Sequence, residues 1–234
     1  MSVVNKIIVD AKKESRSVLS EIEAKEVLKD YGIPVIAGIL AANEEETVFH
    51  AEKMGFPVVL KVVSPQVTHK SDAGGVKLNL KNAAEVKRAH QEIMAKVRES
   101  CPEAEIKGIL VQPMALSGRE LVVGAMQDPL FGPVVMFGLG GIFVEVLKDV
   151  AFRLAPINRE EARDMIRQIK GYPVLEGVRG EPACDLEAIE EIIVKVSKLI
   201  YEQKETISEI DINPLFGYTK GVIAVDARMV LITE

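Results

Sequence analysis

The amino-acid sequence predicts an α+β protein of two lobes. In its first half, apolar segments of strand length alternate with segments of helical periodicity. From Ile109 onward, short apolar segments follow one another in the manner of an antiparallel sheet, with two further helical segments among them. We expect an N-terminal helix at 1–20, a first lobe at 21–108 and a second lobe at 109–234.

Helices are expected where apolar residues recur at helical spacing behind a capping residue. Ser20 with Glu23 forms a capping box, and Asn158 with Glu161 is a second capping signal. The expected helices cover about 4–11, 20–31, 43–54, 83–99, 158–169 and 185–201. His50 and His90 fall within two of them and are expected at the surface.

Strands are expected in the apolar segments between these helices and in the second half of the chain. Pro34 opens the first, and a turn of glycine and polar residues at 217–221 separates the last two. The expected strands are 35–40, 57–63, one that begins near Val76, 109–112, 120–126, 134–137, 143–146, one that ends at 153–154, 207–213 and 221–230.

Composition excludes several classes of protein. With 48% hydrophobic residues, a mean hydropathy of +0.16 and a net charge of −6, the chain is globular and has no dense Lys/Arg run for nucleic acid. No apolar run reaches the roughly 18 residues of a membrane span, and the charged N-terminus is no signal peptide. Cys101 and Cys184 lack metal-ligand spacing and are expected to be reduced thiols, so we expect a cytoplasmic protein.

The expected strand 207–213 presents oxygen-bearing side chains on one face. Isoleucines alternate with Glu209, Asp211 and Asn213, and Asp226 in the next expected strand would face the same site as Asn213. Carboxylate and amide oxygens suit Mg²⁺ that is shared with nucleotide phosphates. The alternative interpretation is a polar strand face in water.

Lys61 is the one charge in the apolar segment 57–63. Such a lysine either reaches water along its stem or contacts an anion such as a nucleotide phosphate. The next segment, 64–76, is longer than a tight hairpin needs, contains His69, and has in Gly74-Gly75 a backbone that can approach a phosphate closely. It does not match the P-loop pattern, so a Walker ATPase is not supported.

The segment 109–115 and the strand that follows it form a candidate hinge for a nucleotide base. Pro113 has no N–H, so a backbone donor to the base must be Met114 or Ala115. Glu120 either accepts from ribose hydroxyls or points outward from its strand. The glycine-rich segment 138–145 precedes a strand rather than a helix, so it is interpreted as a tight connection near the site, not as a dinucleotide fingerprint.

Three motifs carry a resemblance to a known family: HKSDAGGV at 69–76, GGIFVE at 140–145 and DINPL at 211–215. In this order they make the sequence similar to an ATP-grasp domain. More narrowly, it resembles the β subunit of the NDP-forming acyl-CoA synthetases, the ADP-forming acetate–CoA ligase group related to succinyl-CoA synthetase. The resemblance implies an ATP-grasp fold, with two α/β lobes and the nucleotide between them.

The resemblance also implies residue roles. Phosphate contacts would come from Lys61 and the loop residues Lys70, Ser71, Gly74 and Gly75; adenine and ribose contacts from Gln112, Met114 or Ala115, and Glu120; Mg²⁺ ligands would be Asn213 and Asp226. His69 matches a second phosphorylatable histidine, and Asp211 the acidic residue that faces a phosphohistidine. Compared with succinyl-CoA synthetase, the chain has His69 for Gly, Gln112 for Glu and Asp211 for Glu.

The function implied by the resemblance is phosphoryl transfer between a phosphohistidine and ADP/ATP with Mg²⁺, which couples acyl-CoA cleavage to ATP synthesis. The sequence shows no CoA site and no primary phosphohistidine segment, so an α subunit is expected to carry both, in an α₂β₂ heterotetramer. The alternatives are a stand-alone ATP-grasp ligase and a non-catalytic nucleotide-sensing module of a regulatory acyltransferase assembly.

Overall fold

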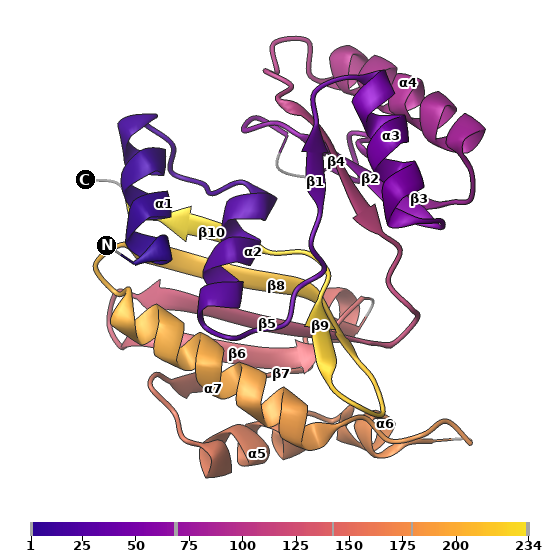
Figure 1. Ribbon diagram of the computed structural model, residues 1–234. Coiled ribbons are helices and arrows are strands. Elements are labelled where there is room, and N and C mark those ends of the chain that lie inside the picture. The colour runs from indigo at the N-terminus through magenta and orange to yellow at the C-terminus, as the bar shows by residue number, and fades with distance from the viewer. Residues whose placement is uncertain (1, 68–69, 142, 179, 233–234) are drawn as a thin grey trace. The chain divides into compact units, whose positions relative to one another are not determined.

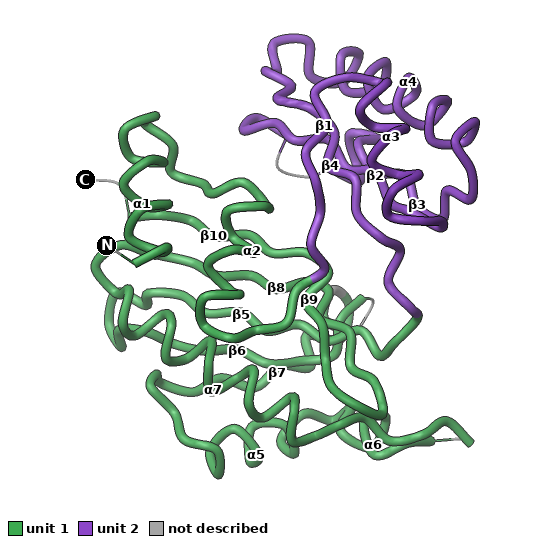
Figure 2. The backbone as a smooth tube through the Cα atoms, in the orientation of Figure 1, with its two compact units in different colours: residues 1–35, 117–234 green, residues 36–116 purple. Residues whose placement is uncertain are grey.

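The computed structural model describes residues 2–67, 70–141, 143–178 and 180–232 (Figure 1). The chain divides into two compact units (Figure 2): unit 1 comprises residues 1–35 and 117–234, and unit 2 comprises residues 36–116. Each unit has a hydrophobic core of its own. Within the described ranges, every helix is too short or too polar to span a lipid bilayer.

Unit 2 is a four-stranded antiparallel sheet in the order β1-β4-β2-β3, with two helices. Leu60 and Val62 of the sheet share the core with Ile93 and Val97 of α4, so one face of the sheet is covered by helix. The elements are β1 (Ile39–Ala41), α3 (Glu44–Met54), β2 (Val58–Val63), β3 (Val76–Leu80), α4 (Ala83–Ser100) and β4 (Gly108–Pro113).

Unit 1 contains a six-stranded sheet in the order β10-β8-β5-β6-β7, with β9 paired to β8. Helices α5 and α7 lie along one face of this sheet, as Figure 1 shows, and Ile193 and Val196 of α7 share a core with Leu121 and Phe137. Its elements are α1 (Val3–Lys13), α2 (Glu21–Asp30), β5 (Arg119–Asp128), β6 (Gly132–Leu139), a π-helical turn (Phe143–Leu147), β7 (Val150–Leu154), α5 (Arg159–Gln168), α6 (Tyr172–Glu176), α7 (Leu186–Glu202), β8 (Ile207–Gly217), β9 (Val222–Ala224) and β10 (Arg228–Leu231).

The expected helices are confirmed, because their start signals act locally. The Ser20–Glu23 capping box forms in full at α2, and the Asn158–Glu161 pair forms one at α5. The side chain of Asn43 accepts from the backbone N–H of Glu46 in the same way at α3. The short helix α6 was not expected, and it has no side-chain cap that would have revealed it.

The expected strand at 143–146 is wrong, since this segment is a π-helical turn. The chain leaves the sheet at the end of β6, where Gly140 donates its N–H to the carbonyl oxygen of Glu120 and Gly141 adopts a φ of +59°. Strand β7 then takes the place beside β6. The segment 143–147 therefore has no ladder to join.

Two other strands differ in length from expectation. The segment 35–40 contributes only β1 and an isolated bridge at Val35. The segment 221–230 is broken into β9 and β10 around Asp226, whose side chain accepts from the N–H of Ala227 at 2.8 Å. That side-chain bond competes with the ladder, which is the usual effect of aspartate next to a strand end.

The unit boundaries differ from the expected lobes. Strand β4, which a boundary at 109 places in the second lobe, pairs with β1 and β2 and so belongs to unit 2. Helices α1 and α2 belong to unit 1, and Val4 and Leu28 lie in its core. Strand pairing decides the assignment of β4, and packing into the core decides that of the two helices.

The expectation that His90 lies at the surface is wrong. The residue is 9% exposed, and its Nδ1 lies 3.0 Å from the hydroxyl of Thr47, between α4 and α3. Burial lowers the pKa of His90, and the nearby Glu44 carboxylate opposes that shift. His50 is half-buried, and its Nδ1 is enclosed with no hydrogen-bond partner among the described residues. Cys101 and Cys184 are free thiols, as expected, and burial raises the pKa of Cys184.

Candidate functional site

The expected row of polar side chains is present on one face of β8 in unit 1. Ile210 and Ile212 point into the core, so Asp211 and Asn213 point to the opposite face. Strand β10 pairs with β8 so that Arg228 stands opposite Asp211. Because β9 continues the same register and the N–H of Val225 bonds to the carbonyl of Pro214, Asn213 stands opposite Asp226. The structure thus brings three predicted residues to one place.

Asp211 is the most perturbed of these groups. Burial raises its pKa, the carboxylates of Glu209 and Asp226 raise it further, and the guanidinium of Arg228 opposes them. Its carboxylate receives no hydrogen bond from any residue that the structure describes. A partly desolvated carboxylate in this state is an acceptor that is available to a donor from outside the chain.

Asn213 and Asp226 are the residues that would hold Mg²⁺. Among the described residues, no group of three or more His, Cys, Asp or Glu side chains could by itself hold a metal ion. Magnesium does not need one, because it keeps several waters and takes one or two protein oxygens together with substrate phosphates. The amide and carboxylate oxygens of this pair fit that requirement.

Glu120 lies on the same face of the unit 1 sheet. Leu121 and Val123 of β5 point into the core, which leaves Glu120, Val122 and Gly124 on the face of Asp211. The turn after β6 packs against this glutamate, since a Cβ on Gly140 would lie 3.1 Å from the Glu120 side chain. The glycine-rich segment is therefore a tight connection beside a predicted site residue, as expected.

In unit 2, Lys61 and Gln112 share a sheet face. Lys61 pairs with Leu110 and Val59 pairs with Gln112, and cross-strand partners point to the same side. The alternate residues Leu60, Val62 and Val111 belong to the core beneath the helices, so Lys61 and Gln112 point away from it. Both are deeply buried, at 5% and 1% exposed. A charged and an amide side chain on one apolar sheet face form a polar site rather than a solvated edge.

The segment after β2 forms a turn at Lys70–Gly74. The N–H of Gly75 donates to the carbonyl of Lys70 at 2.7 Å, and that of Gly74 donates to the carbonyl of Ser71 at 3.0 Å. A Cβ on Gly75 would lie 2.5 Å from Val62, so this position requires glycine. The N–H groups of both glycines are thus hydrogen-bonded within the turn. His69 lies outside the described residues.

The two candidate hinge donors, Met114 and Ala115, differ in whether the backbone N–H is already hydrogen-bonded. The N–H of Met114 donates to the carbonyl of Pro57 at 3.0 Å. Ala115 lies beyond the end of β4, and its N–H makes no backbone hydrogen bond within the described part of the chain. Of the two donors that the sequence offers, Ala115 is the one left for a ligand.

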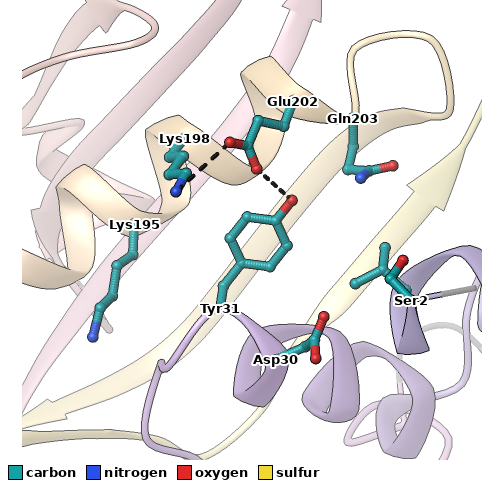
Figure 3. A pocket seen from close by; sticks show the side chains of 8 residues that line it. Ser2, Asp30, Tyr31, Lys195, Lys198, Glu202 and Gln203 are labelled. Atoms are coloured by element: carbon teal, nitrogen blue, oxygen red, sulfur yellow. Dashed lines mark hydrogen bonds and ion pairs between the residues drawn. The ribbon is translucent and has the colours of Figure 1, made fainter.

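A pocket of about 440 Å³ lies elsewhere in unit 1, between α1, α2 and α7 (Figure 3). Glu202 lies at the centre of two contacts in this pocket: Tyr31 donates to Glu202 at 2.9 Å, and Lys198 lies 3.7 Å from the same carboxylate. None of the predicted site residues lines it. The pocket is a polar recess between helix ends, distinct from the candidate site.

Two further residues lie on the polar face: Glu209, which the sequence places there without a site role, and Arg228, which the sequence does not single out. Arg228 donates to Glu209 at 2.8 Å, and both side chains are about half exposed. The position of Arg228 depends on the register between β8 and β10, which the sequence does not specify.

Comparison with known proteins agrees with this geometry. The ATP-grasp domain family matches residues 10–231. The β subunit of ADP-forming acetate–CoA ligase I of Pyrococcus furiosus is 56% identical over 225 residues, which cover 96% of each chain.

Solved structures give the same result. The dinucleotide-forming acetyl-coenzyme A synthetase 1 of Ca. Korarchaeum cryptofilum, in complex with coenzyme A and Ca-AMPCP, has 48% identity and a TM-score of 0.95, covering 97% of this chain and 99% of that one. A second structure of that enzyme holds Mg-AMPPCP and is described with its phosphohistidine segment pointing towards the nucleotide binding site. It has 44% identity and a TM-score of 0.86, covering 98% of this chain and 100% of that one.

The protein is an ATP-grasp protein. Within that class, the chain belongs to the family of β subunits of the ADP-forming acetate–CoA ligases.

Proposed function

We propose that the chain binds Mg·ADP or Mg·ATP and transfers a phosphoryl group between a phosphohistidine and the nucleotide. The observation that carries this proposal is the polar face of unit 1, where Asp211, Asn213 and Asp226 meet. The relatives are acetate–CoA ligases, so the transfer would couple the cleavage of an acyl-CoA to the synthesis of ATP. In that direction the P–N bond of the phosphohistidine breaks, and a P–O bond forms to the terminal oxygen of ADP.

The roles of the residues follow from their chemistry. Lys61 and the turn residues Lys70 and Ser71 would contact the phosphates, and Lys61 would offset negative charge on the transferred group. Asn213 and Asp226 would hold Mg²⁺, which when bound would supply positive charge to the phosphates.

The base would lie at the hinge beside Gln112. Ala115 would donate its N–H to the base, since the N–H of Met114 is engaged with Pro57. Glu120 would accept from the ribose hydroxyls. In this arrangement the nucleotide would be recognised by one backbone donor and by the side chains of Gln112 and Glu120.

The open carboxylate of Asp211 would accept the N–H of the phosphohistidine imidazole, which orients the ring for transfer. That histidine would be carried by an α subunit that also binds CoA, in an α₂β₂ heterotetramer. His69 would be a second phosphorylated histidine that relays the group to ADP, since a neutral imidazole is nucleophilic near pH 7.

The experiment that tests this proposal follows label from γ-labelled ATP with Mg²⁺ into the chain, co-purified with its native partner. Label on this chain that is acid-labile, base-stable and lost in His69→Ala supports the relay. Label confined to the partner leaves the nucleotide role intact and removes His69 from the mechanism. Nucleotide binding with no label on either chain contradicts the transfer function and favours the sensing module.

A further inference from the structure

Two carboxylates, Asp211 and Glu209, lie near the guanidinium of Arg228, and only one of them is bonded to it. Arg228 stands directly opposite Asp211 in the β8–β10 ladder, which is the position for a cross-strand ion pair. Its guanidinium instead bonds to Glu209, two residues earlier on the same face of β8, at 2.8 Å. The arginine therefore leans along the sheet, away from the carboxylate that it stands beside.

The β5 flank of Asp211 carries no polar side chain. On β5 the residue opposite Asp211 is Gly124, which has no side chain to donate to the carboxylate or to cover it. Beyond it, Met136 of β6 stands opposite Gly124, and its terminal methyl would lie 3.2 Å from a Cβ built on that glycine. The Met136 side chain therefore covers Gly124, and neither residue offers Asp211 a hydrogen-bond donor.

The position of Arg228 decides whether Asp211 stays available. A guanidinium has five N–H donors and a preference for two-point contact with a carboxylate. If it turned to Asp211, it would occupy the oxygens that a ligand needs. Glu209 competes for the same guanidinium, and the ion pair that it forms leaves those oxygens open.

We infer that Glu209 is a positioning residue that holds Arg228 off Asp211, so that Asp211 can accept an N–H from an imidazole. This inference rests on the proposed function, in which that imidazole is the phosphohistidine. It gives a function to Glu209 and Arg228, two residues with no other role in the transfer.

The central test is a pair of variants, Glu209→Gln and the double variant Glu209→Gln/Arg228→Met, assayed with the native partner. Glu209→Gln releases the guanidinium, so the rate of phosphoryl transfer should fall about 10- to 100-fold, the equivalent of one hydrogen bond to a charged group. The dissociation constant for Mg·ADP should stay within about twofold of wild type. Removing the released arginine in the double variant should restore most of the rate, which a purely structural role of Glu209 would not predict.

The matched control is Glu14→Gln, which removes another Arg–Glu contact of unit 1, the 2.7 Å pair with Arg16. Arg16 stays bonded to Glu23, so this variant should fold and transfer at the wild-type rate. Thermal unfolding of all variants shows whether Glu209→Gln is folded. Glu209→Gln is expected to fold, because the side chains of Glu209 and Arg228 are about half exposed and such ion pairs contribute little to stability.

A crystal structure of Glu209→Gln separates this inference from the proposed function. The guanidinium of Arg228 should move to within hydrogen-bond distance of Asp211. If it stays away from Asp211, the inference is overturned, whether or not the wild-type complex transfers phosphate. If it reaches Asp211 and the transfer rate is unchanged, an open Asp211 is not needed and the inference is overturned as well. A wild-type complex that transfers no phosphate refutes the proposed function alone. The position of Arg228 in the Glu209→Gln structure then still tests whether Glu209 holds the guanidinium away from Asp211.

Discussion

Replacing Lys61 with Met is expected to weaken the binding of Mg·ADP by about 10- to 150-fold, with the fold intact. The magnitude follows from the position of the lysine. It is 5% exposed in β2, on the sheet face shared with Gln112, so its contact with phosphate would be shielded from water. A hydrogen bond to a charged group contributes about 1.5–3 kcal/mol, and each 1.4 kcal/mol corresponds to about tenfold in affinity. Methionine keeps the length of the stem, so the loss reports the ammonium group.

The assay is isothermal titration of the chain with Mg·ADP, with thermal unfolding measured in parallel. The matched control is Lys77→Met on the neighbouring strand β3, where the lysine pairs with Glu92 of α4. That variant should bind Mg·ADP as the wild type does. Binding by Lys61→Met within about twofold of wild type, with an unchanged melting temperature, would refute the assignment of Lys61 to the phosphate site.

Three further predictions concern the metal, pH and the core. Asp226→Asn should weaken binding of Mg·ADP but leave binding of metal-free ADP unchanged, in titrations with and without EDTA; equal loss in both would exclude Asp226 as a ligand. Burial raises the pKa of Glu23, but hydrogen bonds from Arg16 and Ser20 outweigh it and lower that pKa below its ordinary 4.5. The stabilisation by ionised Glu23 is therefore complete above about pH 4.5 and is lost as the pH falls through the lowered pKa. In urea unfolding, Glu23→Gln should be less stable than wild type at pH 7, and the difference in unfolding free energy should shrink in acid. Phe137→Ala, at a side chain 0% exposed, should lower the free energy of unfolding by about 3–5 kcal/mol, and a change below about 1 kcal/mol would contradict the packing of the unit 1 core.

Features that depend on neighbouring residues could be predicted from the sequence. The six expected helices are confirmed, because a cap such as Ser20 with Glu23 closes within one turn and needs no distant partner. The polar face of β8 was found for the same reason, since alternation along a strand sorts Asp211 and Asn213 from the isoleucines between them. The resemblance in the motifs around these residues was confirmed as family membership.

Features that depend on pairing between distant segments were decided by the tertiary structure. Strand β4 joins unit 2 because it pairs with β1 and β2, and this pairing places Gln112 on the face of Lys61. The register of β10 sets Arg228 opposite Asp211, while the bond to Glu209 draws its guanidinium away. Local propensity determines which residues can form a helix or a strand face. Which faces and charges meet depends on the partner strand and its register, and a shift of one residue would turn every side chain to the other side.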